Sequence, residues 1–282
     1  MGADHFDYCL DQVRQGDRDR YLILLFAPSA ARGHLAALAA FNLELARARE
    51  QTSESLLALI RLQWWREAIE EIRAGGKVRQ HQVATALAET TRACGLNTDL
   101  MLAMIEARES ESEQGAPDSE AVFLARIDAT AGNLLRLSLQ ALRLESQAPA
   151  VSAAATRIGR AYATAGLLRS IVADARRRQV RLPLDRLGAA GVNVDRLYDL
   201  KPQAQLMEFV RGLAEEAAAD LAAARRGDLP RAAKPLTLTA RIAAMHLRRL
   251  SQADYDPFHP SLGAAHPMDA WRLLWTSLSG RF

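Results

Sequence analysis

Apolar residues recur every three or four positions along almost the whole chain, the spacing that places them on one face of an α-helix. Strand-like alternation is nearly absent, and the dominant residues are alanine, leucine, arginine and glutamate, which favour helices. The pattern predicts helices over residues 4–15, 17–26, 30–50, 53–74, 80–93, 98–113, 119–144, 150–173, 203–226, 236–250 and 268–278. The sequence therefore predicts an all-α fold.

Proline and glycine residues interrupt this pattern, but none of the interruptions has the composition of a flexible interdomain linker. The main breaks are Pro28, Gly75, Gly76, Gly95, Gly115, Pro117, Pro149, Pro183 and Pro230. We expect one domain over residues 1–282, a bundle whose long helices enclose a central cavity.

Composition narrows the class of protein. The 282 residues are 49% apolar and 24% charged, as in soluble globular proteins. The N-terminus does not resemble a signal peptide, the run YLILLFAP is too short to span a bilayer, and the two cysteines give no disulfide framework. We expect a cytoplasmic protein. A net charge of +3 without a recognition motif argues against nucleic-acid binding.

Positive charge is concentrated in residues 167–183, LLRSIVADARRRQVRLP, where Asp174 stands among five arginines. Guanidinium groups match the oxygens of phosphate and carboxylate, so the cluster is a candidate anion site. Two simpler interpretations stay open. The arginines form a solvated basic turn, or they complement the negative end of a helix dipole.

Other candidate sites give weaker signals. Glu67 and Glu71 share a helix face and form a candidate magnesium pair, although such pairs on exposed helices are usually only solvated. The six histidines lack the spacing of zinc ligands, and we find no Ser-His-Asp order, Walker loop or dinucleotide fingerprint.

Two tryptophan pairs bear on packing. Trp64 and Trp65 are adjacent, so one is expected in the core and the other on a surface or cavity wall. Trp271 and Trp275 are four residues apart on one helix face. We expect them to pack in the core, with a lid or a membrane-surface contact as the alternative.

Four segments together resemble a known family. They are YLILLFAPSAARGHLAALAAFNLELARARE, LQWWREAIEEI, DATAGNLLRL and GRAYATAGLLRSIVADARRRQVRLPLDRLGAAGV. From about residue 21 to residue 255 the chain resembles the squalene and phytoene synthases, which are head-to-head prenyl transferases. FNLELARARE and RLQWW are most similar to one branch, the complex I assembly factors with a phytoene-synthase-like domain and their bacterial relatives. The resemblance implies an isoprenoid-synthase bundle around a prenyl cavity.

The resemblance also implies a site. In this family two aspartate-rich motifs hold magnesium ions that bind the substrate diphosphate. The matching positions here include Ala46, Arg47 and Glu50 in the first motif, and Ser170 and Asp174 in the second. Asp174 and Glu50 are thus the remaining metal-ligand candidates, and we expect magnesium binding to be weakened. Whether NADPH takes part stays open.

The implied residues for diphosphate binding are cationic side chains and the remaining aspartate. They are Arg47, Arg169, Asp174, Arg176 and Arg177.

Two main functions follow from the resemblance. The first is an altered member that binds an isoprenoid diphosphate or a similar anionic ligand, or acts with a partner in respiratory complex I assembly. The alternative is an active, magnesium-dependent transferase that makes a C30 or C40 isoprenoid. A purely structural helical module is the third interpretation. Peripheral contact with the inner membrane fits the first two, although no anchor is visible.

Overall fold

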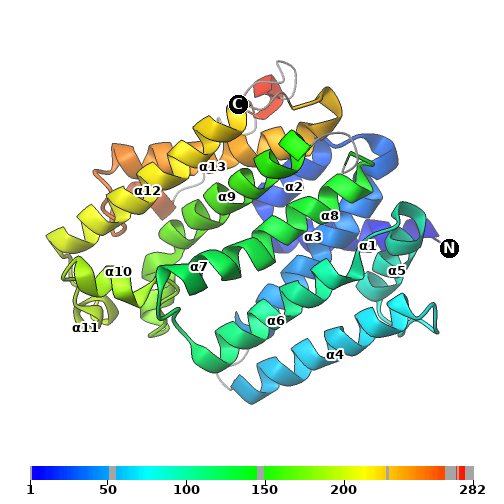
Figure 1. Ribbon diagram of the computed structural model, residues 1–282, viewed down its shortest axis with the longest axis horizontal. Coiled ribbons are helices and arrows are strands. Elements are labelled where there is room, and N and C mark those ends of the chain that lie inside the picture. Colours follow the sequence, from blue (N-terminus) through cyan, green and yellow to red (C-terminus); the bar gives the residue numbers. More distant parts are fainter. Residues whose placement is uncertain are drawn as a thin grey trace.

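The computed structural model describes residues 2–50, 55–144, 149–226, 229–263, 271 and 273–276. In this part of the chain every regular element is a helix (Figure 1). The longer α-helices are α1 (Gly2–Gly16), α2 (Arg18–Leu25), α3 (Ser29–Glu50), α4 (Ser55–Arg73), α5 (Gln82–Cys94), α6 (Thr98–Gln114), α7 (Glu120–Ile127), α8 (Asn133–Ala141), α9 (Pro149–Arg176), α12 (Ala204–Arg225) and α13 (Lys234–Gln252). The predicted all-α fold is confirmed.

The N-terminal helices share one apolar core. Helix α3 packs against α1, α5 and α8, and α4 packs against α6. Four alanines of α3, at positions 36, 37, 39 and 40, are buried together with Phe41, so neighbouring backbones can approach closely. Trp65 of α4 enters this core and Trp64 remains half-buried, which confirms the prediction for that pair.

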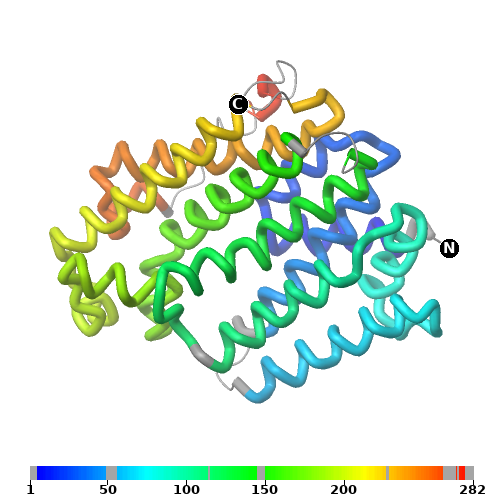
Figure 2. Tube along the Cα trace, viewed as in Figure 1, coloured from blue at the N-terminus to red at the C-terminus, as the bar shows by residue number. Residues whose placement is uncertain are grey.

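The C-terminal helices form a second core around α9, which packs against both α12 and α13. The chain order is visible in Figure 2, where the green α7–α9 segments lie between the blue and cyan N-terminal helices and the yellow and orange C-terminal ones. Gly159 allows the closest approach of α9 to the preceding segment, because a Cβ at this position would lie 3.1 Å from the Cα of Gly132.

The predicted helix over 119–144 is divided into three parts. Between α7 and α8 the chain forms a π-helix, Asp128–Gly132. Phe123 and Ile127 of α7 join the C-terminal core. Helix α8 lies between the two cores, with Leu139 in the C-terminal one and Leu134 and Leu137 in the N-terminal one. The periodicity of apolar residues did not predict this turn, although Asp128, Thr130 and Gly132 have low helix propensities.

Two short α-helices in the described ranges were not predicted, α10 (Leu184–Ala189) and α11 (Val194–Tyr198). They follow Pro183 and Asn193, which are the N-cap residues. The expected core position of Trp271 and Trp275 is wrong. Their exposed fractions are 65% and 74%, because Leu273, at 1%, occupies the buried face of this short helix.

No helix in the described ranges combines the length and the apolar character that a bilayer-spanning segment requires.

The close contact at Gly159 gives a stability prediction. Gly159→Ala should lower the free energy of unfolding by about 1–3 kcal/mol, because the new Cβ meets the backbone of the π-helix. The matched change Gly166→Ala in α9 meets no atom within 4 Å and should raise it by about 0.5–1 kcal/mol. Urea unfolding followed by circular dichroism measures both. Equal effects of the two changes would contradict the close packing described here.

Candidate functional site

A cavity of about 880 Å³ lies among the long helices. Its walls come from α2, α3, α6, the α7–π-helix segment, α9 and α13, together with residues 257–262. Apolar wall residues include Phe123, Leu167, Met245, Phe258 and Leu273. A cavity of this size and lining can hold an extended apolar group with a polar head.

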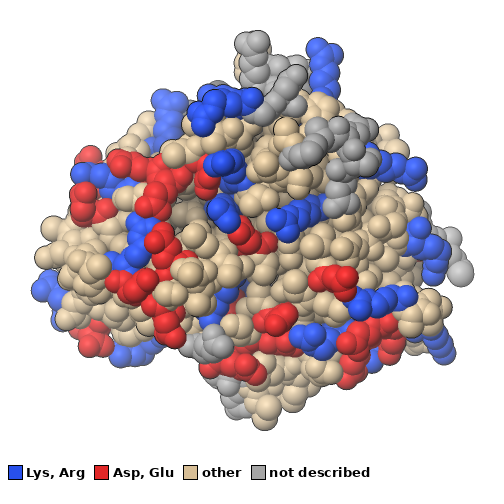
Figure 3. Space-filling view, viewed as in Figure 1, with Lys and Arg blue, Asp and Glu red and all other residues tan. Residues whose placement is uncertain are grey.

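The polar part of the lining is strongly cationic. Three carboxylates, Asp17, Asp19 and Glu111, face the cavity. Eight arginines line it: Arg18, Arg20, Arg108, Arg126, Arg169, Arg176, Arg181 and Arg249. On the face of the molecule shown in Figure 3, by contrast, blue and red side chains are interspersed. Eight arginines against three carboxylates give the cavity lining an excess of positive charge, which favours an anionic ligand.

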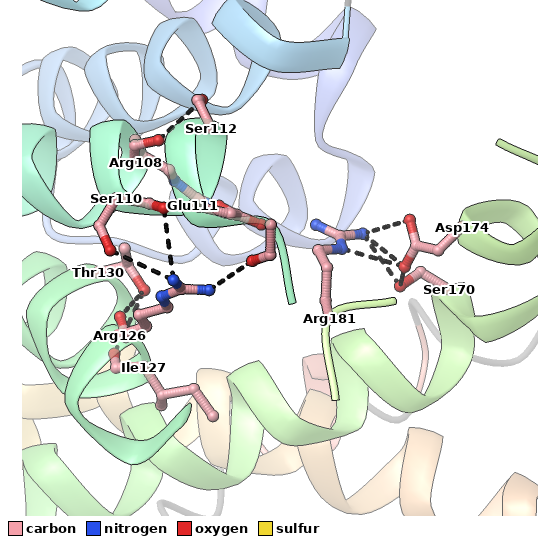
Figure 4. Close-up of polar contacts among 11 residues, drawn as sticks. Arg108, Ser110, Glu111, Ser112, Arg126, Ile127, Thr130, Ser170, Asp174 and Arg181 are labelled. Carbon is pink, nitrogen blue, oxygen red and sulfur yellow. Dashed lines mark hydrogen bonds and ion pairs between the residues drawn. The ribbon is translucent and has the colours of Figure 1, made fainter. Parts of the chain in front are cut away.

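Asp174 is 4% exposed and is held by a neighbouring arginine. Arg181 donates from Nη2 to both carboxylate oxygens at 2.9 Å and from Nε to Oδ2 at 3.0 Å. The Ser170 hydroxyl lies 2.6 Å from Oδ2 and accepts a bond from Arg181 Nη2 at 3.1 Å (Figure 4). Ser170 and Arg181 face the cavity, and Asp174 lies behind them.

A second cationic group comes from α6 and α7. Arg126 donates to the carbonyl of Gly115 at 2.7 Å and to the Ser110 hydroxyl at 3.2 Å, while Arg108 pairs with Glu111 at 2.7 Å. In Figure 4 this group and the Arg181 group lie on opposite sides of the open space. Arg108, Arg126 and Arg181 line the same cavity, so they can contact one bound anion from two sides.

A third polar group joins α2, α9 and α13. The carboxylate of Asp19 accepts from His246 Nε2 at 2.8 Å and from Arg169 Nη1 at 3.2 Å. Burial raises the pKa of Asp19, but the hydrogen bonds and charges of His246 and Arg169 outweigh burial, so its pKa lies below the usual value. Arg169 is therefore already engaged with an acidic partner at the cavity wall.

Two half-buried groups near Asp19, Arg20 and Tyr162, support the α2 wall. Arg20 pairs with Asp17 and lies 5.1 Å from the ring centre of Tyr162. Burial alone would lower the pKa of Arg20, yet the charge of Asp17 raises it above its ordinary value. Burial raises the pKa of the Tyr162 hydroxyl, so this group stays neutral at physiological pH.

The residues predicted from the sequence separate in the structure. Arg169 and Arg176 line the cavity, whereas Arg177 is exposed and lies outside the lining. Arg47 also lies outside it and donates to Gln12 of α1 at 3.0 Å. The side chain of Glu50 lies outside those that the structure describes.

The donor set does not suit a magnesium ion. Magnesium prefers carboxylate and water oxygens in octahedral geometry, but both oxygens of Asp174 are bound by Arg181. At the first motif, Ala46 lines the cavity and supplies no ligand atom. Among the described side chains, no three His, Cys, Asp or Glu residues are grouped so that they could hold a metal ion.

The paired glutamates of α4 lie elsewhere. Glu67 and Glu71 both bind Arg79, at 2.7 and 3.0 Å, and neither faces the cavity.

Arg108 and Arg126 were not predicted as site residues, because they come from two different helices and no local motif marks them. Arg181 was visible within the arginine cluster, but its partner could not be assigned because the chain turns back between residues 177 and 180.

Comparisons with known proteins agree with this architecture. A family model described as Squalene/phytoene synthase matches residues 13–278. Assembly factor 6 of NADH dehydrogenase (ubiquinone) complex I from Mus musculus is 30% identical over 257 residues, which cover 90% of this chain and 76% of the mouse protein. The Homo sapiens protein of the same name is 28% identical over 263 residues, covering 93% and 78%.

Solved structures share the fold at lower identity. A dehydrosqualene synthase bound to a ligand superposes with a TM-score of 0.85 at 18% identity, covering 99% of this chain and 97% of that structure. The squalene synthase HpnC from Alicyclobacillus acidocaldarius has a TM-score of 0.78 at 18% identity, covering 90% and 96%. The expected isoprenoid-synthase fold is confirmed. The chain belongs to the squalene/phytoene synthase family.

Proposed function

We propose that this chain is an altered member of its family, one that binds a prenyl diphosphate-like anion through arginines and acts in the assembly of respiratory complex I. One observation carries the proposal, the buried Asp174 carboxylate held by Arg181 and Ser170. A carboxylate in a bidentate pair with a guanidinium has little remaining capacity for a metal ion. The ligand's charge is then met by the arginines themselves.

The charge of the cavity supports this ligand class. Arg108, Arg126 and Arg181 surround one region of the lining, and guanidinium groups bind phosphate oxygens in pairs. The apolar wall, which includes Leu167 and Met245, suits a prenyl-like tail. Without a metal ion to neutralise the leaving diphosphate, the ligand would be bound without being ionised.

The assembly role is supported by the relatives. The mouse and human proteins are named assembly factors of complex I, and both matches cover at least 90% of this chain. Ala46 and Ser170, which supply no carboxylate for a magnesium ion, are consistent with a role other than synthesis. The ligand would then serve the assembly function rather than become a product.

The first prediction from this proposed function concerns magnesium. Farnesyl diphosphate should bind equally well with excess magnesium and with EDTA, and extraction should give no C30 or C40 hydrocarbon with or without NADPH.

Asp174→Asn should lower the free energy of unfolding by about 3–5 kcal/mol, because it weakens a buried ion pair. Calorimetry, product extraction and urea unfolding measure the three quantities.

A different outcome would favour the transferase alternative. If magnesium were required for binding, and hydrocarbon formed and then disappeared in Asp174→Asn, Asp174 would be a metal ligand and the altered-member proposal would fail.

The second prediction compares two adjacent arginines at the end of α9. Arg176→Gln should weaken the binding of inorganic pyrophosphate by about three- to tenfold, because one hydrogen bond to a charged group at an exposed site contributes about 1 kcal/mol. Arg177→Gln is the matched control and should bind like the wild type, since Arg177 lies outside the cavity. Titration calorimetry measures both, and equal losses would show that only the general charge of this segment matters.

The third prediction concerns assembly in cells. Deleting the gene for this chain should lower the amount of intact complex I, and the wild-type chain should restore it. Arg177→Gln should restore it fully and Arg176→Gln only in part, because ligand binding supports the role. Native gels stained for NADH dehydrogenase activity measure this. Unchanged complex I in the deletion strain would remove the assembly function.

A further inference from the structure

The short helix that contains residues 271 and 273–276 presents an unusual outer surface. Trp271, Leu274 and Trp275 have exposed fractions of 65%, 37% and 74%. Exposed indoles are uncommon on soluble proteins, whose large apolar residues are mostly buried. We call these three residues the tryptophan face.

The tryptophan face is held in place by the opposite side of the same helix. Leu273 is 1% exposed and packs in a cluster with Ile23 of α2 and with Leu238, Ile242 and Met245 of α13. Thr276, at 3%, is also buried. The helix therefore has a fixed inner side, and its indoles are directed outward by the helical repeat.

The supporting helix α13 contains four lysine or arginine residues and no acidic residue. Lys234, Arg241 and Arg248 are seven residues apart, which places them along one line of the helix. Arg248 is exposed, and the other two are half-buried.

The basic line lies beside the helix that carries the tryptophans. Lys234 and Arg241 each precede by four residues a side chain that packs against Leu273, namely Leu238 and Met245. Exposed indoles are thus combined with cations on a neighbouring helix, of which Arg248 is exposed and Lys234 is half-buried. This combination suits the interface of an anionic bilayer, where indoles occupy the headgroup level and basic side chains meet lipid phosphates.

We infer that the tryptophan face docks this protein on an anionic lipid bilayer. The charge of α13 selects a membrane over an uncharged apolar partner, because cations gain most against a dense layer of phosphates. Leu273, on the same helix, lines the ligand cavity, so docking places one cavity wall next to the lipid. The inference goes beyond the proposed function and does not depend on the identity of the cavity ligand.

Vesicle flotation of the full chain tests the inference. The wild type should float with vesicles of equal parts phosphatidylcholine and phosphatidylglycerol, with a blue shift of tryptophan fluorescence, and much less with phosphatidylcholine alone. Trp271→Ala/Trp275→Ala should lower the partition coefficient by about tenfold or more, because two interfacial anchors are lost. Lys234→Gln/Arg248→Gln should lower binding to the anionic vesicles only.

The matched control is an exposed apolar pair on a distant helix. Leu56 and Ile60 of α4 are 65% and 56% exposed, and α4 lies at the opposite edge of the molecule from the short red helix in Figure 1. Leu56→Ala/Ile60→Ala should float like the wild type. Trp271→Ala/Trp275→Ala should still bind pyrophosphate like the wild type, because neither tryptophan lines the cavity. Failure of docking is thereby distinguished from failure of the cavity.

Three results would overturn the inference. The first is that the wild type floats with neither kind of vesicle. The second is that Trp271→Ala/Trp275→Ala floats as well as the wild type. The third is that Leu56→Ala/Ile60→Ala loses as much flotation as the tryptophan variant. Loss of a protein partner in the tryptophan variant, with flotation unchanged, would assign the surface to a protein instead.

Discussion

The pairing of Arg181 with Asp174 is the interaction on which the character of the cavity depends. Taking both charges out of water is costly, and the pair is tolerated because its geometry is bidentate and the Ser170 hydroxyl joins it. The pair connects the end of α9 to the segment that leads to α10. It also removes the carboxylate from the cavity surface while leaving a guanidinium there.

The rest of the cavity lining is also rich in cationic side chains. The cavity is lined by eight arginines and three carboxylates. Close structural similarity to a dehydrosqualene synthase, with a TM-score of 0.85, fixes the arrangement of helices but does not determine the chemistry at their inner faces. Substitutions such as Ala46 and Ser170 change the donor atoms without disturbing helices α3 and α9.

Packing explains how the helices can surround a cavity of this size. Small residues let the backbones approach where no ligand space is needed, as at Gly159 against Gly132. The continuous segment of α7, the π-helix and α8 contributes side chains to both cores. The π-helix places Thr130 and Ala131 on the cavity wall. The cavity therefore lies where neighbouring helices do not approach each other closely.

The sequence alone determined the helical class, the positions of most long helices and the family, because these depend on local periodicity and on contiguous motifs. It also named Arg169, Asp174 and Arg176 as candidate site residues, since they occupy one short segment. Arg169 and Arg176 line the cavity, and Asp174 lies behind the lining. Tertiary structure decided the rest. Arg108, Arg126 and Arg181 meet only because α6, α7 and the turn after α9 converge, and Arg47 turns to Gln12 because α1 packs beside α3. The exposure of Trp271 and Trp275 was likewise decided by packing, since helical spacing places residues on a common face but does not say which face is buried.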